Sequence, residues 1–379
     1  MTTLGGVTLK TVRTRNLLAA LALCSLSAAA QCRLPDVVPD ALSHLTPTQL
    51  LDAGHYLRTE QLLDPIAKER PRDAHTAWLL SRAKAALGKL DEAEALADTA
   101  LSLDPDNPAY HVQVAAVAGR MAEKANLFKR LGYVRRAKME LDAAAALNAR
   151  DPDTQWGLMM FYYVAPAMFG GDKTKAQQIG QQLAAVAPDL GRYYQGRLAL
   201  EMKDPDAAET FYKQSIGENP LLFETASNLA LFYIRTKPDQ AKAERWACQA
   251  VHTDPTRADS WALLARVYTL CGCWTEATRV AEIAETVDGE NLVPYYAIAE
   301  AAIEHGEQTE LAATFLRKYL SQPVEGNQPT EAAARMHLGT ALARLGNRAD
   351  AVKELQSALE LDSTLEAART ELKRLEKTK

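Results

Sequence analysis

The stretch that most constrains the fold of this chain runs from Trp261 to Asp288, WALLARVYTLCGCWTEATRVAEIAETVD. Residues in its first half recur at the i, i+3, i+4 and i+7 positions of one helix face, namely Trp261, Leu264, Ala265 and Tyr268. Gly272 permits a sharp turn, after which the period resumes at Trp274, Ala277, Ala281 and Ala284. The small alanines lie where two antiparallel helices must approach closely. The stretch therefore predicts a helical hairpin.

A single hairpin cannot bury its apolar face alone, and similar units flank this one on both sides. Their recurring positions include Trp78, Gly88 and Asp104-Pro105, then Asn228, Tyr233 and Asp254-Pro255, and finally Leu338, Gly346 and Asp362. Asp-Pro closes a unit because proline cannot continue a helix. The pattern W-x2-L-A-x2-Y…A-x3-A-x2-A resembles the tetratricopeptide repeat (TPR).

The resemblance implies an all-α fold, an α-solenoid of about eight or nine TPR hairpins over residues 42–363. Residues 364–379 are charged and amphipathic, which suits the polar cap that a solenoid needs at its end. The units between Tyr110 and Pro188 are irregular, and the loop Pro166–Asp172 contains a Gly-Gly turn. Residues 120–190 resemble a group of exported bacterial TPR proteins. The loop is either a tolerated insertion or a functional element, and the sequence leaves this open.

The first thirty residues have the layout of a secretory signal peptide. Lys10, Arg13 and Arg15 precede a short apolar run, Leu17–Leu26, and Ala28-Ala29-Ala30 offers a cleavage site. Residues 1–30 are thus expected to be removed after Ala30, which places the protein in the periplasm or outside the cell. The alternative is a buried N-terminal helix. The apolar run is too short to remain as a membrane span.

The expected mature chain is acidic and begins with an extended lead-in. Cleavage removes three positive charges and no negative ones, so the net charge of −5 becomes −8. An acidic protein of this kind is a poor candidate for binding nucleic acid. Residues 31–41, QCRLPDVVPDA, carry two prolines and predict extended backbone.

Cysteine spacing leaves several alternatives open. A lipid anchor at Cys32 is disfavoured because Gln31, and not a small residue, precedes it. Cys271 and Cys273 form a lone C-x-C without a second cysteine or histidine pair, so no metal site is expected. In an oxidising compartment, Cys248 and one of that pair can form a disulfide, but spacing alone does not establish the pairing.

The sequence predicts a non-catalytic protein without a cofactor. It contains no H-E-x-x-H, P-loop, G-x-G-x-x-G or G-x-S-x-G motif, and its seven histidines are scattered. Acidic pairs such as Asp91-Glu92 begin second helices, where they complement the helix dipole.

The resemblance also indicates where a partner would bind, because the first helices of such hairpins line the concave face of the solenoid. Positions counted from the Trp261 slot place eight side chains on this face, namely Trp78, Tyr193 and Tyr296, then Arg82, Arg197 and Arg266, and finally Arg235 and Arg344. Arginines bind carboxylates through two parallel hydrogen bonds, and aromatic faces suit apolar side chains. We expect an extended peptide or an acidic tail. The alternative is that the arginines pair with Glu201, Glu300 or Glu304.

Two functions follow from this interpretation. The first is a protein–protein interaction scaffold or adaptor in the bacterial cell envelope, which binds a partner on the concave face. The second is an accessory or chaperone-like factor of an envelope enzyme or of a secretion or biogenesis complex. In the second case the loop Pro166–Asp172 would contribute to the site of a catalytic partner.

Overall fold

The computed structural model describes residues 32–36, 41–324 and 328–377, and the regular elements in these ranges are all helical. A 3₁₀ turn, η2 (Ala41–His44), precedes the α-helices, and a second, η3 (Ala167–Phe169), follows α8. The α-helices are α2 (Pro47–Asp52), α3 (Tyr56–Glu69), α4 (Ala74–Ala86), α5 (Leu90–Leu103), α6 (Pro108–Lys124), α7 (Leu127–Leu147), α8 (Pro152–Val164), α9 (Lys173–Val186), α10 (Pro188–Glu201), α11 (Pro205–Glu218), α12 (Phe223–Arg235), α13 (Gln240–Thr253), α14 (Ala258–Thr269), α15 (Trp274–Val287), α16 (Val293–His305), α17 (Thr309–Tyr319), α18 (Glu331–Arg344), α19 (Arg348–Leu361) and α20 (Glu366–Lys377). The predicted signal peptide and its cleavage site lie outside the described residues.

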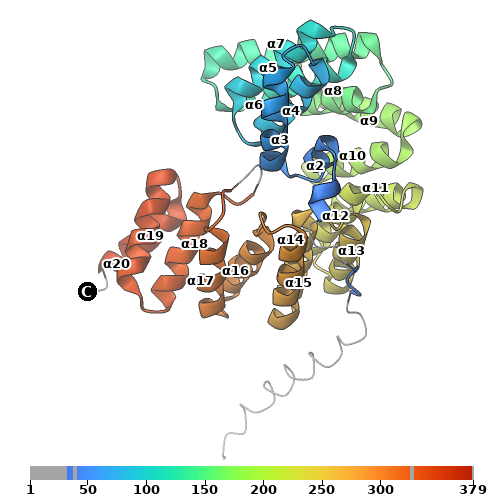
Figure 1. Cartoon of the computed structure of the whole chain (residues 1–379). Coiled ribbons are helices and arrows are strands. Elements are labelled where there is room, and N and C mark those ends of the chain that lie inside the picture. Colours follow the sequence, from blue (N-terminus) through green and yellow to red (C-terminus); the bar gives the residue numbers. More distant parts are fainter. Residues whose placement is uncertain (1–31, 37–40, 325–327, 378–379) are drawn as a thin grey trace, which may run out of the picture.

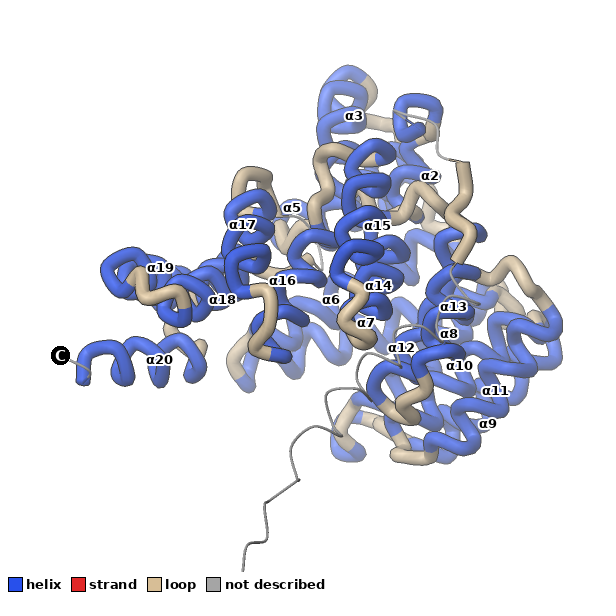
Figure 2. The backbone as a smooth tube through the Cα atoms, turned by 90° about the horizontal axis from the view of Figure 1, so that it is seen from below, coloured by secondary structure: helices blue, strands red, loops and turns tan. Residues whose placement is uncertain are grey.

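Consecutive helices pair into nine hairpins in this part of the chain, from α2–α3 to α18–α19, and α20 packs on the last one. The α-solenoid fold is therefore confirmed. First helices of successive hairpins contact one another, for example α4 with α6 and α14 with α16, and so form the inner layer of the curve. Figure 1 and Figure 2 show how the hairpins wind into an open superhelix.

The Trp261 hairpin illustrates why the repeats adopt this shape. Gly272 has a φ of 68°, a left-handed conformation that glycine adopts without steric cost, and α15 begins two residues later. Ala277 and Ala281 are fully buried between the two helices. Trp261 is only 1% exposed, and its indole N–H donates to the Pro255 carbonyl oxygen at 2.8 Å. The large Trp261 side chain and the small alanines thus set the distance between the two helices of the hairpin.

The hydrophobic core is continuous in the second half of the described chain. One cluster of buried residues extends from Tyr193 on α10 to Leu375 on α20, whereas the first half contains several smaller clusters. Close helix contacts depend on small residues here also. A Cβ atom on Gly196 would lie 2.7 Å from the ring of Tyr212, so only glycine fits between α10 and α11.

The irregular units predicted before Pro188 correspond to a longer hairpin and a structured joint. Helices α6 and α7 contain 17 and 21 residues, compared with 14 in α5 and 13 in α8. The α8–α9 joint turns through η3 and Gly170, whose φ is 94°. Asp172 then caps α9 by accepting a hydrogen bond from the Lys175 backbone N–H. No helix in the described ranges combines the length and apolarity that crossing a membrane requires.

Candidate functional site

The eight predicted binding residues all lie on first helices. Trp78 and Arg82 belong to α4, Tyr193 and Arg197 to α10, Arg266 to α14 and Tyr296 to α16, while Arg235 and Arg344 are the last residues of α12 and α18. The inner layer therefore carries all eight, but their environments differ.

The expectation that Tyr193 and Tyr296 offer their rings to a partner is wrong. Each is 5% exposed. Asn228 donates a hydrogen bond to the Tyr193 hydroxyl at 3.3 Å, and the Tyr296 ring lies 5.2 Å from that of Tyr319. First helices pack directly on their neighbours, so this slot points into the interface between repeats. Both tyrosines are core residues.

Trp78 is half-buried and belongs to an aromatic group on α4 and α6. Its ring centroid lies 5.4 Å from that of His75 and 6.0 Å from that of Tyr110. The guanidinium carbon of Arg82 lies 4.8 Å above the Trp78 ring. Arg82 also forms an ion pair with Asp52 on α2, with a nitrogen–oxygen distance of 3.0 Å. This arginine is therefore already engaged within the chain.

Two further arginines are also engaged, as the alternative interpretation expected for Arg266. Arg266 pairs with Glu300 and with Glu304 on α16, the latter at 2.9 Å. Arg344 donates to the Ile303 carbonyl oxygen at 2.7 Å. Arg82, Arg266 and Arg344 thus each contact a carboxylate or carbonyl oxygen of a neighbouring first helix.

Acidic groups also face the inside of the curve. Desolvation raises the pKa of Asp153 on α8 and of Asp259 on α14, although both residues keep solvent access. Nearby cations oppose this shift, Arg82 for Asp153 and Arg257 for Asp259. The concave face is thus mixed in charge.

Arg197 differs from the engaged arginines, because it is exposed and has no carboxylate partner among the described residues. It lies above an aromatic stack from α8 and α10. The Trp156 and Tyr194 rings are 4.0 Å apart at an interplanar angle of 13°, and the Arg197 guanidinium carbon is 5.0 Å from the Trp156 ring. Desolvation raises the pKa of the Tyr194 hydroxyl, so this tyrosine stays neutral. Trp156 and Tyr194 were not predicted as site residues, because they do not occupy the Trp261-derived slots.

Arg235 is likewise exposed, at the end of α12, and no ion pair involves it in the part of the chain that the structure describes. It has no aromatic neighbour comparable to the Trp156–Tyr194 stack.

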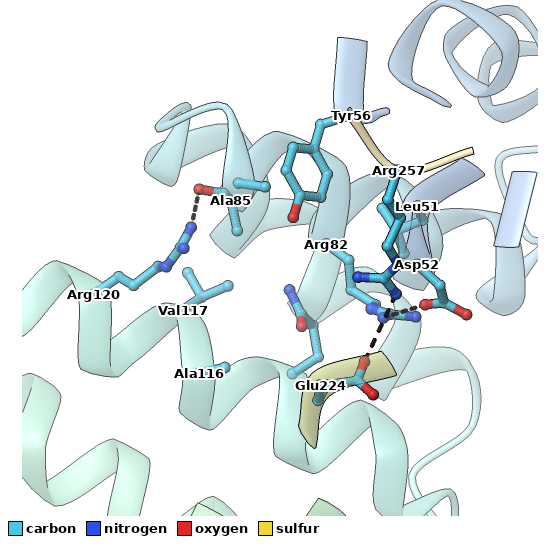
Figure 3. A pocket seen from close by; sticks show the side chains of 12 residues that line it. Leu51, Asp52, Tyr56, Arg82, Ala85, Ala116, Val117, Arg120, Glu224 and Arg257 are labelled. Atoms are coloured by element: carbon cyan, nitrogen blue, oxygen red, sulfur yellow. Dashed lines mark hydrogen bonds and ion pairs between the residues drawn. The ribbon is translucent and has the colours of Figure 1, made fainter. Parts of the chain in front are cut away.

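A cavity of about 660 Å³ lies between the first hairpins and the middle of the chain, where α2, α4 and α6 face Glu224 and Arg257 (Figure 3). Figure 3 shows Arg82 beside Asp52, and Arg257 beside Glu224 at 3.7 Å. The Arg257 guanidinium carbon also lies 4.1 Å from the Phe223 ring. Because its walls carry ion pairs and small alanines, the cavity suits a polar segment with charged groups better than a large apolar ligand.

The cavity exists because the start of the chain is attached to the middle of the solenoid. His55, between α2 and α3, lies with its Nδ1 3.1 Å from Asp288 Oδ2 and its Nε2 2.9 Å from the Thr256 carbonyl oxygen. A disulfide joins Cys32 to Cys248 on α13. Sequence reasoning did not predict these contacts, since no spacing rule relates residues so far apart.

The disulfide pairing differs from the one considered in the sequence analysis, in which Cys248 would bond Cys271 or Cys273. Cys248 bonds Cys32 and not Cys271 or Cys273, which bond each other. Cys32 reaches Cys248 because its backbone N–H donates to the Glu244 carboxylate at 3.2 Å. Its sulfur cannot carry a thioether-linked lipid while it is in the disulfide.

A metal site at this place is also disfavoured. The Cys32 and Cys248 sulfurs and a His252 ring nitrogen lie within 4.8 Å of one another. Zinc binds thiolates, however, and both sulfurs are consumed by the disulfide. His252 instead contacts the Arg33 carbonyl oxygen at 2.7 Å.

Comparison with known proteins agrees with the repeat architecture. Family models described as tetratricopeptide repeat match residues 50–117 and 332–365. Among solved structures, yeast Tom70 is 12% identical with a TM-score of 0.50, covering 87% of this chain and 79% of that one. A human IFIT1 dimer with PPP-AAAA is 16% identical with a TM-score of 0.50, covering 87% and 80%. TTC0263, a thermophilic TPR protein of Thermus thermophilus, is 21% identical with a TM-score of 0.44, covering 50% and 95%. No curated protein matches the chain.

Proposed function

Because this chain is a tetratricopeptide-repeat protein, we propose that it is a non-catalytic scaffold that binds a protein or peptide partner on its concave face. The observation that carries the proposal is the exposed Arg197 above the Trp156–Tyr194 stack. Because a guanidinium group has five N–H donors and Arg197 has no internal carboxylate, donors remain for a ligand beside its contact with the Tyr193 hydroxyl.

The partner that this site suits carries a carboxylate next to an apolar side chain. The guanidinium group binds the carboxylate through two parallel hydrogen bonds, while the stacked rings of Trp156 and Tyr194 contact the apolar group. The polar cavity bounded by Arg82, Arg257 and Glu224 would accept further backbone and charged groups of an extended segment. We propose a protein partner and not nucleic acid, since the chain carries a net charge of −5.

We further propose that the protein works in the bacterial cell envelope, in the periplasm or outside the cell. The support comes from the signal-peptide layout of residues 1–30 and from cysteine use. Cys32, Cys248, Cys271 and Cys273 are all in disulfides, which persist in oxidising compartments and are rare in the cytosol. N-terminal sequencing of the protein from an envelope fraction tests this proposal, and an intact Met1 on a cytosolic protein would contradict it.

Affinity capture from the envelope fraction tests the binding site. The parent chain should retain a partner that Arg197→Ala and Trp156→Ala lose, because these changes remove the cation and the aromatic surface. Arg279→Ala is the matched control, since Arg279 is an exposed arginine on the second helix α15. Binding should weaken as salt rises to about 0.15 M, where the screening length is about 8 Å. Equal capture by the parent and both site variants would refute this site.

A further inference from the structure

The outer surface around α7 exposes an unusual number of apolar side chains. Six of the thirteen exposed large hydrophobic residues of the described chain lie on α7, at the end of α8 and in the α8–α9 joint, namely Leu127, Phe128, Met139, Leu147, Val164 and Met168. Phe128 is 90% exposed and Met168 is 81% exposed. The turn η3, which contains Met168, contacts α7. Scattered single apolar residues are normal on protein surfaces, but this concentration is not.

The α6–α7 hairpin, which carries Leu127 and Phe128, is longer than the hairpins beside it. Helix α7 is seven residues longer than α5 and eight longer than α8, a difference of about 10 Å at 1.5 Å per residue. Its first turn, which contains Leu127 and Phe128, follows the end of α6, where Arg130 donates to the Ala122 carbonyl oxygen, but both apolar side chains remain exposed. Figure 1 shows α7 along the outer edge of the first hairpins, on the side away from α14–α20.

The same surface is positively charged in an acidic protein. Lys124, Lys129 and Arg135 are exposed, and no carboxylate pairs with them within the described ranges. Arg130 donates only to the uncharged Ala122 and Ala125 carbonyl oxygens, so its charge is not neutralised. The acids of this part of the chain are Glu123, Glu140, which contacts His111, and Asp142, which pairs with Lys138. The whole chain, in contrast, carries a net charge of −5.

We propose that this surface, the outer face of α7 with the α8–α9 joint, docks the protein on an anionic lipid bilayer. A convex surface that combines Phe and Leu side chains with lysine and arginine matches the interface of a membrane, where apolar groups enter the acyl boundary and cations contact headgroups. A protein partner of ordinary size would need a complementary surface of about 800 Å². Separate apolar tips divided by cations do not supply such a surface, but fluid lipids adapt to it.

Phe128 inserts first, because it is the most exposed apolar residue of the surface and lies in the first turn of the protruding helix. Lys129 follows it on α7, and Lys124 is the last residue of α6 just before the turn into α7, so both remain at the headgroups. The concave face stays free for its partner, so lipid docking is independent of the proposed scaffold function.

Vesicle co-sedimentation tests the proposal with the chain as it is isolated from producing cells, so that all variants share the same N-terminus. The probe is a vesicle of phosphatidylcholine with about one third phosphatidylglycerol, compared with pure phosphatidylcholine. Replacing Lys124, Lys129 and Arg135 with Gln should lower the partition coefficient about 100-fold, at about 1 kcal/mol per charge. The combined change Leu127→Ser and Phe128→Ser should lower it at least about tenfold.

The matched controls replace the same kinds of residue at other places on the protein surface. Leu221→Ser with Leu361→Ser removes two exposed leucines elsewhere, and Lys353, Arg279 and Lys373 changed to Gln removes three exposed cations elsewhere. Both controls should bind as the parent does. Equal loss in the controls and the α7 variants, or equal binding to both vesicle types, would overturn the proposal.

A fluorescence measurement reports on the site itself. In Phe128→Trp, anionic vesicles should shift the added indole emission to the blue, and brominated lipids should quench it, relative to the parent chain. If vesicles leave the emission unchanged, but cross-linking of an envelope protein to the chain alters it, the surface docks a protein and the lipid proposal is refuted.

Discussion

The imidazole of His55 forms a buried contact with the carboxylate of Asp288, with Nδ1 and Oδ2 3.1 Å apart and the two side chains 3% and 5% exposed. On the other side of the ring, Nε2 lies 2.9 Å from the Thr256 carbonyl oxygen. A carbonyl oxygen only accepts, so Nε2 must carry a hydrogen, and one further proton is then shared between Nδ1 and Oδ2. The contact joins the first hairpin to the α15–α16 connection.

Removal of one member of this pair should be costly. His55→Leu keeps most of the side-chain volume but leaves Asp288 buried without its partner, which should lower the free energy of unfolding by about 3–5 kcal/mol. Urea denaturation followed by circular dichroism measures the change. His44→Leu is the control, because His44 is exposed on η2. Similar midpoints for both variants would show that the contact does not hold the first hairpin.

The Cys32–Cys248 disulfide should stabilise the same closure, because its cysteines are 216 residues apart in sequence. Cys32→Ser with Cys248→Ser should lower the free energy of unfolding by about 2–5 kcal/mol, since the unfolded chain regains the entropy of a long closed loop. The Cys271–Cys273 pair, separated by two positions, closes a very short loop and serves as control. Non-reducing peptide mapping should recover a fragment that links Cys32 to Cys248, and its absence would contradict the pairing.

Lys203 occupies the turn position that glycine takes in several other hairpins. Its φ is 62°, close to the 68° of Gly272, and a side chain in this left-handed region is strained. Lys203→Gly should therefore raise the free energy of unfolding by about 0.5–1 kcal/mol. Lys353→Gly, inside α19, should lower it by about 1 kcal/mol. Loss of stability in the Lys203 variant would mean that this lysine makes compensating contacts.

Glu209 should contribute a stability that depends on pH. Hydrogen bonds from Lys213, Lys237 and Tyr233 lower the pKa of its carboxyl from 4.5 to about 2. A carboxyl with a depressed folded pKa stabilises the protein above its unfolded pKa, and this contribution is lost as pH falls toward about 2.

Glu209→Gln should thus lower the free energy of unfolding at pH 7 by about 1–2 kcal/mol. This value is smaller than the pKa shift alone would give, because solvent screens the partly exposed Lys213 and Lys237. The difference between variant and parent should narrow between about pH 5 and pH 3, as guanidinium denaturation at several pH values measures. Glu218→Gln on the same helix is the control, and a constant difference across this range would contradict the assignment.

Local patterns determined the repeat architecture of this protein. The period of Trp261, Leu264 and Tyr268 and the turn at Gly272 predicted α14, α15 and their close contact, because helix formation and hairpin turns depend on neighbouring residues. Counting positions from the Trp261 slot of the repeat also placed Arg197 on the inner layer. It did not distinguish an exposed position from a contact between repeats, so Tyr193 and Tyr296 were predicted as binding residues although they are buried.

Only the tertiary structure decided which distant segments meet. The small rotation from each hairpin to the next accumulates over many repeats and brings His55 to Asp288 and Cys32 to Cys248. No local sequence pattern specifies the total rotation that accumulates over the repeats. The same holds for Phe128, whose exposure depends on how the helices pack around the start of α7, and for Arg197, whose availability depends on which carboxylates the neighbouring first helices present.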